Sequence, residues 1–263
     1  MTRERREPLA LLRARVITLE STAALRRAAA VLARDERAGA QLLAARCGAR
    51  ADALVAERRR LAQLFSLRAR LLRGGARVIA GIDEVGVGPL AGPVVACAVV
   101  FAERPWLPGL GDSKQLTRAA RERIDGEIRK CASAIGLAEV WPAEIDRLNI
   151  YRAALEAMRR AVLALGVAPD HLLVDARTIP GIAATQTPLI RGDARDGSIA
   201  AASIVAKVHR DALMARLDAA HPGYGFAQHK GYGTADHLAA LQRLGPTPLH
   251  RRSFAPVSQL ALF

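Results

Sequence analysis

Two adjacent carboxylates, Asp83 and Glu84, stand between a short apolar segment and a glycine-rich stretch. The apolar segment Val78–Ile82 is predicted to form a strand, and the glycines within 86–92 interrupt the chain after it. Acids at the end of a buried strand are unfavourable unless something pairs them. Because consecutive strand side chains point to opposite faces, the strand must twist or end there for both carboxylates to converge.

Three interpretations of this stretch compete. The acids can be solvated or ion-paired, the Gly-x-Gly-x-x-Ala spacing over 86–91 can be a dinucleotide-binding loop, or the carboxylates can hold a hard cation such as Mg²⁺ or Mn²⁺. The dinucleotide loop is disfavoured, because the acids would repel a pyrophosphate and Pro89 and Pro93 disrupt the helix it requires. The segment that follows, Val94–Phe101, also has the composition of a strand. The cation site needs further acids from elsewhere in the chain.

Two further acids end short apolar segments. His171–Asp175 is predicted to be a strand, and Thr187–Asp193 is a fourth short run that again ends in an acid. Parallel or mixed sheets collect functional groups at one edge, where strand-end acids can share a cation. The candidate metal ligands are therefore four carboxylates, which could hold two divalent ions in a phosphodiester-cleaving site: Asp83, Glu84, Asp175 and Asp193.

Helical patterns surround these strands. Helices are predicted over 118–130, 142–165 and 199–218, the first capped by Thr117 and the last by Ser198, and a further strand over 134–140.

Other polar residues near these elements are candidates or rivals. Ser113 and Lys114 could offer a hydroxyl and an ammonium group to a phosphate, and Lys207 lies on the basic side of the last helix. Asp196 and Asp211 are rival acids. A solvated or ion-paired role is predicted for both, because Asp196 falls in an expected loop and Asp211 stands inside a helix next to an arginine.

The composition favours a polyanionic partner inside a reducing compartment. The net charge is +14 over 263 residues, which indicates nucleic acid unless it reflects only an Arg-rich and Ala-rich bias. The three cysteines are far apart and form no C-x-x-C pair, which fits a cytoplasmic location. No apolar run approaches the ~18 residues of a membrane span, and the charged N-terminus leads into no signal-type segment. Nothing requires more than a monomer.

The first 75 residues are predicted to be an Arg-rich helical extension. They hold 17 Arg against 7 Asp and Glu, a net charge of +10, and their leucines recur at helical spacing with a break at 35–39. This surface could lie along phosphates, be a solvated face, or cap the rest of the protein. With a linker at 72–75, the expected division is 1–75 for the extension, 76–257 for a catalytic domain and 258–263 for a tail.

Seven segments in order resemble ribonuclease HII. They are Gly-Ile-Asp-Glu-Val-Gly-Val-Gly-Pro-Leu-Ala-Gly-Pro (81–93), Asp-Ser-Lys-Gln-Leu (112–116), Leu-Val-Asp (173–175), Arg-Gly-Asp (191–193), Ala-Ala-Ser-Ile-Val-Ala-Lys-Val-His-Arg-Asp (201–211), His-Lys-Gly-Tyr-Gly-Thr (229–234) and His-Arg-Arg-Ser-Phe (250–254). The Arg-rich part resembles, more loosely, the helical extension of some bacterial members.

This resemblance implies an α/β, RNase H-like fold with a mixed central sheet flanked by helices, an N-terminal helical extension and a C-terminal helical and loop region. It implies an endonuclease that cuts the RNA strand of RNA–DNA duplexes, including 5′ of a single ribonucleotide in duplex DNA, and leaves a 3′-hydroxyl and a 5′-phosphate. The metal-binding acids of the family carry over onto the four carboxylates above, with Mg²⁺ or Mn²⁺ as cofactor.

The resemblance also implies a reader of the ribonucleotide, and here the sequence departs from the family. The tyrosine of the family matches Tyr232, which would stack near the RNA–DNA junction, and its Gly-Arg-Gly loop matches Gly86-Val87-Gly88. Val87 replaces the arginine, so one charge is lost. Ribonuclease HIII, which is less tied to junctions, also lacks that arginine and is an alternative. A non-catalytic nucleic-acid binder is a second alternative, but it would gain nothing from clustered acids.

The last residues resemble a short docking motif. Gln259-Leu-Ala-Leu-Phe263 is similar to the pentapeptide with which bacterial repair proteins bind the β sliding clamp, with Leu260, Leu262 and Phe263 as anchors and Gln259 as an orienting group. The alternative is a tail that folds back on the body of the protein.

Overall fold

A five-stranded mixed sheet carries the acidic residues. In the computed structural model, which describes residues 7–260, the strand order is β3-β2-β1-β4-β5. The strands are β1 (Ile79–Val85), β2 (Val94–Val100), β3 (Ala134–Val140), β4 (His171–Asp175) and β5 (Thr185–Leu189). The expected strands at 94–101, 134–140 and 171–175 are confirmed to within a residue, because each is a short apolar or β-branched run between breakers.

The register of β1 against its two neighbours places the acids. β1 runs antiparallel to β2 and parallel to β4, with Ile82 beside Val174. Asp83 follows Ile82 inside β1, and Asp175 follows Val174 as the last residue of β4, so these two acids occupy equivalent positions on adjacent parallel strands. This is the arrangement that the repeated pattern of an apolar run followed by an acid predicted.

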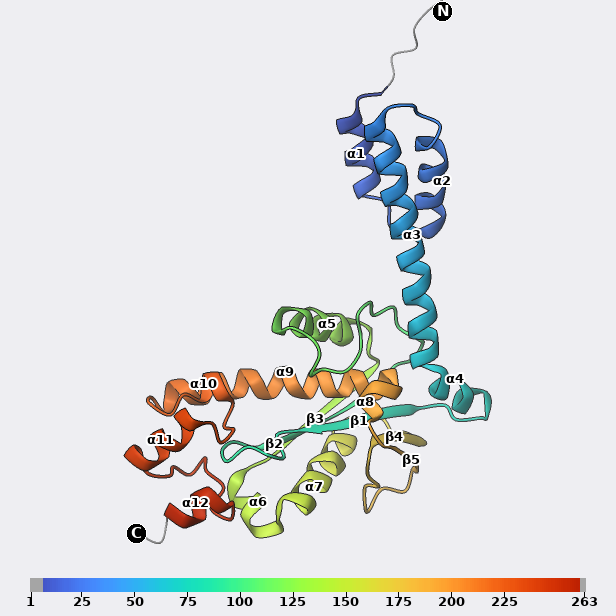
Figure 1. Cartoon of the computed structure of the whole chain (residues 1–263). Helices are drawn as coiled ribbons and strands as arrows, with labels where there is room; N and C mark the ends of the chain where they lie inside the picture. The colour runs from blue at the N-terminus through green and yellow to red at the C-terminus, as the bar shows by residue number, and fades with distance from the viewer. Residues whose placement is uncertain (1–6, 261–263) are drawn as a thin grey trace, which may run out of the picture. The chain divides into compact units, whose positions relative to one another are not determined.

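Helices cover both faces of the sheet. In Figure 1, α9 (Gly197–Ala220) lies along one face, and α7 (Ile150–Leu163) lies against the other. Gly81 on β1 and Gly136 on β3 admit this packing, because a Cβ at Gly81 would collide with the backbone of α9 and one at Gly136 with the backbone of α7. The apolar side of α7, including Met158, packs on the buried residues of β1, β2 and β4.

The remaining helices of this part of the chain are α4 (Ser66–Arg73), α5 (Arg118–Cys131), α6 (Pro142–Leu148), α8 (Gly192–Arg195), α10 (Phe226–His229), α11 (Ala235–Leu244) and α12 (Ala255–Leu260). Thr117 caps α5 as predicted, since its side chain accepts a hydrogen bond from the Ala120 amide at 3.2 Å.

The chain divides into two compact units, residues 1–63 and 64–263. Within the first, α1 (Leu9–Ile17), α2 (Thr22–Leu32) and α3 (Ala38–Leu64) bury a small core that includes Leu25, Leu43 and Cys47. The interruption expected at 35–39 separates α2 from α3. The linker expected at 72–75 lies within the second unit, because α4 packs its leucines against β1, β4 and α9.

Three local predictions are wrong. The helix expected over 142–165 is two helices, since Asn149 has φ 69° and caps the second one. β5 ends at Leu189, and Asp193 lies on α8 after a left-handed Arg191, so it does not terminate a strand. The cap of α9 is Asp196, which accepts hydrogen bonds from the amides of Ser198 and Ile199 at 2.7 and 3.3 Å. Asp196 is therefore a fully buried capping residue, not a solvated loop acid.

Within residues 7–260, no helix combines the length and the apolar character needed to cross a membrane.

Candidate metal centre and nucleic-acid interface

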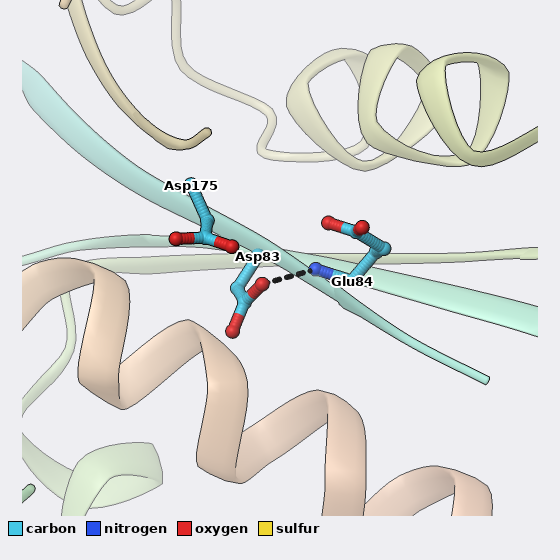
Figure 2. Close-up of side chains that lie close together, drawn as sticks. All are labelled: Asp83, Glu84 and Asp175. Atoms are coloured by element: carbon cyan, nitrogen blue, oxygen red, sulfur yellow. Dashed lines mark hydrogen bonds between the residues drawn. The ribbon is translucent and has the colours of Figure 1, made fainter. Parts of the chain in front are cut away.

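Asp83, Glu84 and Asp175 form an acidic cluster where β1 and β4 end. One carboxylate oxygen from each residue can be chosen so that all three lie within 4.8 Å of one another. Figure 2 shows Asp83 directed toward the helix beside it, with Glu84 on the opposite side of β1 and Asp175 close to Asp83. The Glu84 amide donates to Asp83 Oδ1 at 2.8 Å. β1 continues to Val85, so the acids converge at the edge of a twisted strand and not beyond its end.

Burial disfavours the ionised form of the three acids in this cluster. It raises the pKa of Asp83 well above its ordinary value, and the neighbouring Glu84 raises it further. Burial likewise raises the pKa values of Glu84 and Asp175. Glu84 Oε2 is buried and has no hydrogen-bond partner among the described residues. Three hard oxygen donors, crowded together with one left unpartnered, fit a divalent cation such as Mg²⁺ or Mn²⁺.

Asp193 lies next to this cluster but outside its tight core. Its charge is among the causes of the raised pKa of Asp175, after burial. Its Oδ2 atom accepts a hydrogen bond from Lys114 Nζ at 3.3 Å. Asp193 is buried while the Lys114 side chain is 81% exposed, so the lysine reaches in from the surface. The structure thus brings Lys114 to the acids.

Ser113 and Lys207, which were expected to meet a phosphate, both contact other side chains of the protein. Ser113 is buried, and its hydroxyl lies 3.0 Å from that of Ser203 on α9. Ser203 in turn hydrogen-bonds Asp83 and lowers its pKa, against the larger effect of burial. Lys207 donates to Asp211 at 2.7 Å, which confirms the ion-paired role predicted for Asp211.

The glycine loop and Tyr232 lie side by side. A Cβ on Gly88 would sit 3.8 Å from the Tyr232 ring, and Tyr232 is 44% exposed. Val87 packs its side chain against the core. The amides of Val87 and Gly88 donate no hydrogen bond within residues 7–260, so they are free to bind an anionic oxygen.

Two buried arginines hold this loop from inside. Arg251 donates to the carbonyls of Gly86, Val87 and Gly92 at 2.5–3.1 Å. Arg210 donates to those of Ala91, Pro93 and Lys230 at 3.0–3.1 Å.

Both guanidinium groups are fully buried and form no salt bridge in the part of the chain that the structure describes. Burial lowers the pKa of each, yet an arginine keeps its charge at neutral pH. The loop therefore lies over two uncompensated positive charges.

Several residues that contact the acids or the glycine loop were not predicted from the sequence. Arg210 and Arg251 stand inside the quoted motifs, but nothing in the sequence shows that their side chains turn inward. Arg177 was also missed: it lies 3.7 Å from Glu84 and 5.0 Å over the Tyr151 ring. Ser203 also stands inside one of the quoted motifs, but nothing in the sequence shows that its hydroxyl contacts Asp83.

The predicted docking motif is only partly described. Gln259 is exposed near the end of α12, which finishes at Leu260, and Leu262 and Phe263 lie outside the described residues.

Comparison with solved structures first gives the class. The ribonuclease H2 from Pyrococcus horikoshii OT3 aligns with a TM-score of 0.59 and 26% identity, covering 70% of this chain and 96% of the other. RNase HII from Archaeoglobus fulgidus, solved as a PCNA:RNase HII complex, aligns with the same score and 25% identity over 67% and 95%. Bst-RNase HIII, solved in complex with Mn²⁺, is 20% identical with a TM-score of 0.55 over 72% and 70%, which shows shared fold alone. The fold and the acid cluster define a nuclease with the RNase H-like fold.

Comparison with protein sequences then gives the family. The family model of ribonuclease HII matches residues 80–257. Ribonuclease HII of Geobacillus thermodenitrificans is 53% identical over 229 residues, which is 87% of this chain and 88% of that protein. The chain belongs to the ribonuclease HII family, and the predicted enzyme class, an endonuclease among the hydrolases, is confirmed.

Proposed function

We propose that this chain cuts the RNA strand of RNA–DNA duplexes with the help of divalent cations, and that it also cuts 5′ of a single ribonucleotide embedded in duplex DNA. The products are a 3′-hydroxyl and a 5′-phosphate. The observation that carries the proposal is the convergence of Asp83, Glu84 and Asp175 within 4.8 Å in a chain of this family. Hybrid cleavage follows from the family, and the choice of the single ribonucleotide rests on the loop and Tyr232.

Asp83, Glu84, Asp175 and Asp193 are the residues that would hold Mg²⁺ or Mn²⁺. When bound, such ions activate the attacking water and stabilise charge on the phosphate and on the departing 3′ oxygen. The crowding of the acids supports this role, because cations relieve the repulsion and desolvation that raise their pKa values.

Neighbouring groups of the chain hold these acids in place. Ser203 hydrogen-bonds Asp83, and the Gly192 amide donates to Asp175 Oδ1 at 2.6 Å. Arg177 offsets part of the charge of Glu84. Lys114 contacts Asp193 from the solvent side and is placed to meet a phosphate of the bound strand.

The free amides of Val87 and Gly88 would receive a phosphate of the cleaved strand, and Tyr232 would lie against the ribose at the junction. The two buried arginines beneath the loop add positive potential there, which partly replaces the charge that Val87 removes.

The decisive experiment compares three labelled duplexes, each with Mg²⁺ or Mn²⁺: DNA with one ribonucleotide, all-DNA, and an RNA–DNA hybrid. Cleavage 5′ of the lone ribonucleotide and of the hybrid, with a 3′-hydroxyl product and no cutting of all-DNA, is expected. Cutting of the hybrid alone would replace the proposal with the specificity of ribonuclease HIII, and Val87→Arg would test the cause. Duplex binding without cleavage in either metal would instead favour the non-catalytic binder.

We also propose that the tail docks on the β sliding clamp through Gln259, Leu260, Leu262 and Phe263. The sequence supports this, and a family member from Archaeoglobus fulgidus was solved with PCNA. Deleting residues 259–263 should abolish clamp binding in a pull-down and leave cleavage of free duplexes unchanged. Retained binding, or none by the intact chain, would refute the role.

A cytoplasmic location is part of the proposal, because three free cysteines fit a reducing compartment.

The division into a helical extension (1–75), a catalytic region (76–257) and a tail (258–263) remains part of this proposal. The positive charge of the extension supports a contact with duplex backbones. A truncated chain lacking residues 1–63, which hold 14 Arg against 7 Asp and Glu, would test this contact by the salt dependence of binding.

A further inference from the structure

Three histidines gather around the segment that carries Tyr232, and the chemistry described above uses none of them. They are His229, His237 and His250, and the rings of His229 and His237 stack with centroids 4.4 Å apart. His237 and His250 are fully or almost fully buried. Burial lowers the pKa values of both, that of His250 to about 4, so these two imidazoles are neutral near pH 7.

Their hydrogen bonds fix which nitrogen carries each proton. The Thr247 amide donates to His250 Nδ1 at 2.9 Å, so the neutral His250 has its hydrogen on Nε2. The two Nε2 atoms of His250 and His237 lie 3.1 Å apart, and His250 must be the donor. His237 therefore carries its hydrogen on Nδ1, which donates to the Tyr232 carbonyl at 2.9 Å. We call this directed series, from Thr247 through His250 and His237 to Tyr232, the histidine relay.

The relay ends on a peptide that is held at both sides. The Tyr232 amide donates to the His229 carbonyl at 3.0 Å, and the Tyr232 carbonyl also accepts from the Thr234 amide at 2.8 Å. Both backbone polar groups of Tyr232 are therefore hydrogen-bonded within the protein, although the residue is 44% exposed. The relay thus acts on the backbone from which the ring projects and touches nothing that a substrate could reach directly.

The same segment is tied to the glycine loop. The Leu90 amide donates to the Gly231 carbonyl at 2.8 Å, and Arg210 donates to the Lys230 carbonyl. Lys230 and Gly231 have φ values of 55° and 85°, a left-handed conformation that Lys230 adopts at an energetic cost. Such a segment keeps its shape only when the surrounding contacts enforce it, and the relay supplies one of those contacts.

We propose that His237 and His250 are positioning residues for ribonucleotide specificity. By fixing the Tyr232 carbonyl, the relay sets the angle at which the ring meets Gly88, and so the fit to a single ribose at a junction. Longer hybrids offer ribose at every position of the strand and depend less on this angle. The inference rests on the proposed role of Tyr232 as the residue that reads the junction.

Two isosteric variants of His237 separate positioning from general structure. In His237→Asn, the amide nitrogen can take the place of Nδ1 and still donate to the Tyr232 carbonyl. In His237→Gln, the amide reaches the place of Nε2 and can contact His250, but Tyr232 loses its donor. Both are polar and of similar size. His171→Gln is a matched control, since His171 is also buried, with a hydrogen bond to Thr187 at 2.8 Å, and lies on β4.

The measured quantity is the ratio of kcat/KM for a duplex with one ribonucleotide to kcat/KM for an RNA–DNA hybrid, together with the Tm of each variant. We expect His237→Gln to lower this ratio about 5- to 20-fold, the size of one lost buried hydrogen bond with some loosening of the segment. His237→Asn should keep the ratio within about twofold of the starting protein, and His171→Gln should leave it unchanged whatever its Tm.

Tyr232→Ala distinguishes an error in the proposed role of Tyr232 from an error in the proposed role of the relay. If it leaves the ratio unchanged, the proposed role of Tyr232 is wrong. If it lowers the ratio while His237→Gln does not, or if the Gln and Asn variants lose activity on both substrates equally, the relay is merely structural and the inference is overturned. Should His237→Gln fail to fold, His250→Gln decides by the opposite expectation: its amide keeps the donor to His237, so an unchanged ratio is required.

Discussion

The acid cluster and the histidine relay are both buried polar sites, but they treat their polar atoms in opposite ways. Around Asp83, three carboxylates crowd together, their pKa values are raised, and Glu84 Oε2 has no partner in the described chain. Around Tyr232, the nitrogen atoms of His237 and His250 all have hydrogen-bond partners, and no ionised group is required.

The difference indicates which site awaits a ligand. Buried polar atoms are nearly always satisfied in folded proteins, so three crowded carboxylates with an unsatisfied oxygen among them favour a bound cation. A fully satisfied network instead holds one conformation. This contrast supports the proposals that the acids hold cations and that the relay holds the backbone beneath Tyr232.

Removing one acid of the cluster should abolish cleavage and relieve the repulsion between carboxylates in the metal-free protein. We expect Asp83→Asn to lower kcat by at least ~1,000-fold, because the charge that would hold a cation is lost. The same variant should unfold at a higher temperature than the starting protein in the absence of metal, since two remaining carboxylates repel less than three. Steady-state kinetics and calorimetry in chelator would measure both.

The control for this variant is Glu122→Gln, which removes an exposed acid of α5 that pairs with Arg118. Its activity and Tm should stay close to those of the starting protein. Persistent cleavage by Asp83→Asn would show that the metal ligands are wrongly assigned, and an unchanged apo Tm would contradict the repulsion argument alone.

Removing a buried arginine whose hydrogen bonds hold the glycine loop should cost stability. In Arg251→Met the carbonyls of Gly86, Val87 and Gly92 lose their donors, and we expect the free energy of unfolding to fall by about 3 kcal/mol. Urea unfolding measures this, and Arg252→Met, which changes an exposed neighbour, is the control. A loss below about 1 kcal/mol would mean that water replaces the guanidinium and that the loop needs no internal support.

The relay should also make stability fall in acid. His250 has a folded-state pKa of about 4 against an ordinary value of 6.5, so between these values the unfolded chain binds more protons than the native state. The free energy of unfolding must then decrease as the pH drops from about 6.5 toward 4, by on the order of 3 kcal/mol for a shift of this size. Three further imidazoles also lower the pKa of His250, those of His237, His221 and His229.

Comparison with His250→Gln isolates that contribution, because the buried Asp196, whose pKa is raised to about 6, has the opposite pH dependence in both proteins. Denaturant unfolding at pH 7 and pH 4.5 should show a smaller acid loss in the variant. Equal losses in the two proteins would mean that His250 is protonated without penalty.

The smallest expected effect concerns the position where the chain departs from its family pattern. Val87→Arg adds a charge at the loop over two buried arginines, so attraction to the phosphate is partly offset by repulsion from within. We expect kcat/KM on the single-ribonucleotide duplex to rise only about two- to fivefold, with a steeper salt dependence. Val87→Gln, similar in length but uncharged, is the control. A gain above 50-fold would show that the buried arginines do not substitute for the lost charge.

Local patterns gave much of the fold correctly. Apolar runs followed by acids predicted β1 and β4 and placed Asp83, Glu84 and Asp175 at one edge. This succeeded because the residues that form a strand and the residues that interrupt it are neighbours in the sequence. They failed where a single residue changed the backbone direction. Asn149 and Arg191 adopt positive φ without being glycine, and neither has a sequence signal that distinguishes it from an ordinary polar residue.

The sequence did not predict which polar side chains are buried or what they contact. A solvated or ion-paired role was expected for Asp196, which is fully buried, and Arg210 and Arg251 point inward although most arginines are exposed. Most of their partners are carbonyls of residues 86–93, more than 100 residues away in the chain, which no local pattern can reveal.

The sequence by itself determined the chemistry of this protein. The acids, their spacing and the ordered motifs identify the family and the carboxylate site, because ligand type and strand alternation are properties of neighbouring residues. Only the tertiary structure decided how the reading surface is held. Arg251 reaches carbonyls that are more than 150 residues away in the chain. Each hydrogen bond of the relay joins residues within 13 positions of one another, but whether an imidazole is a donor, an acceptor or a charge depends on the burial and partners that folding provides.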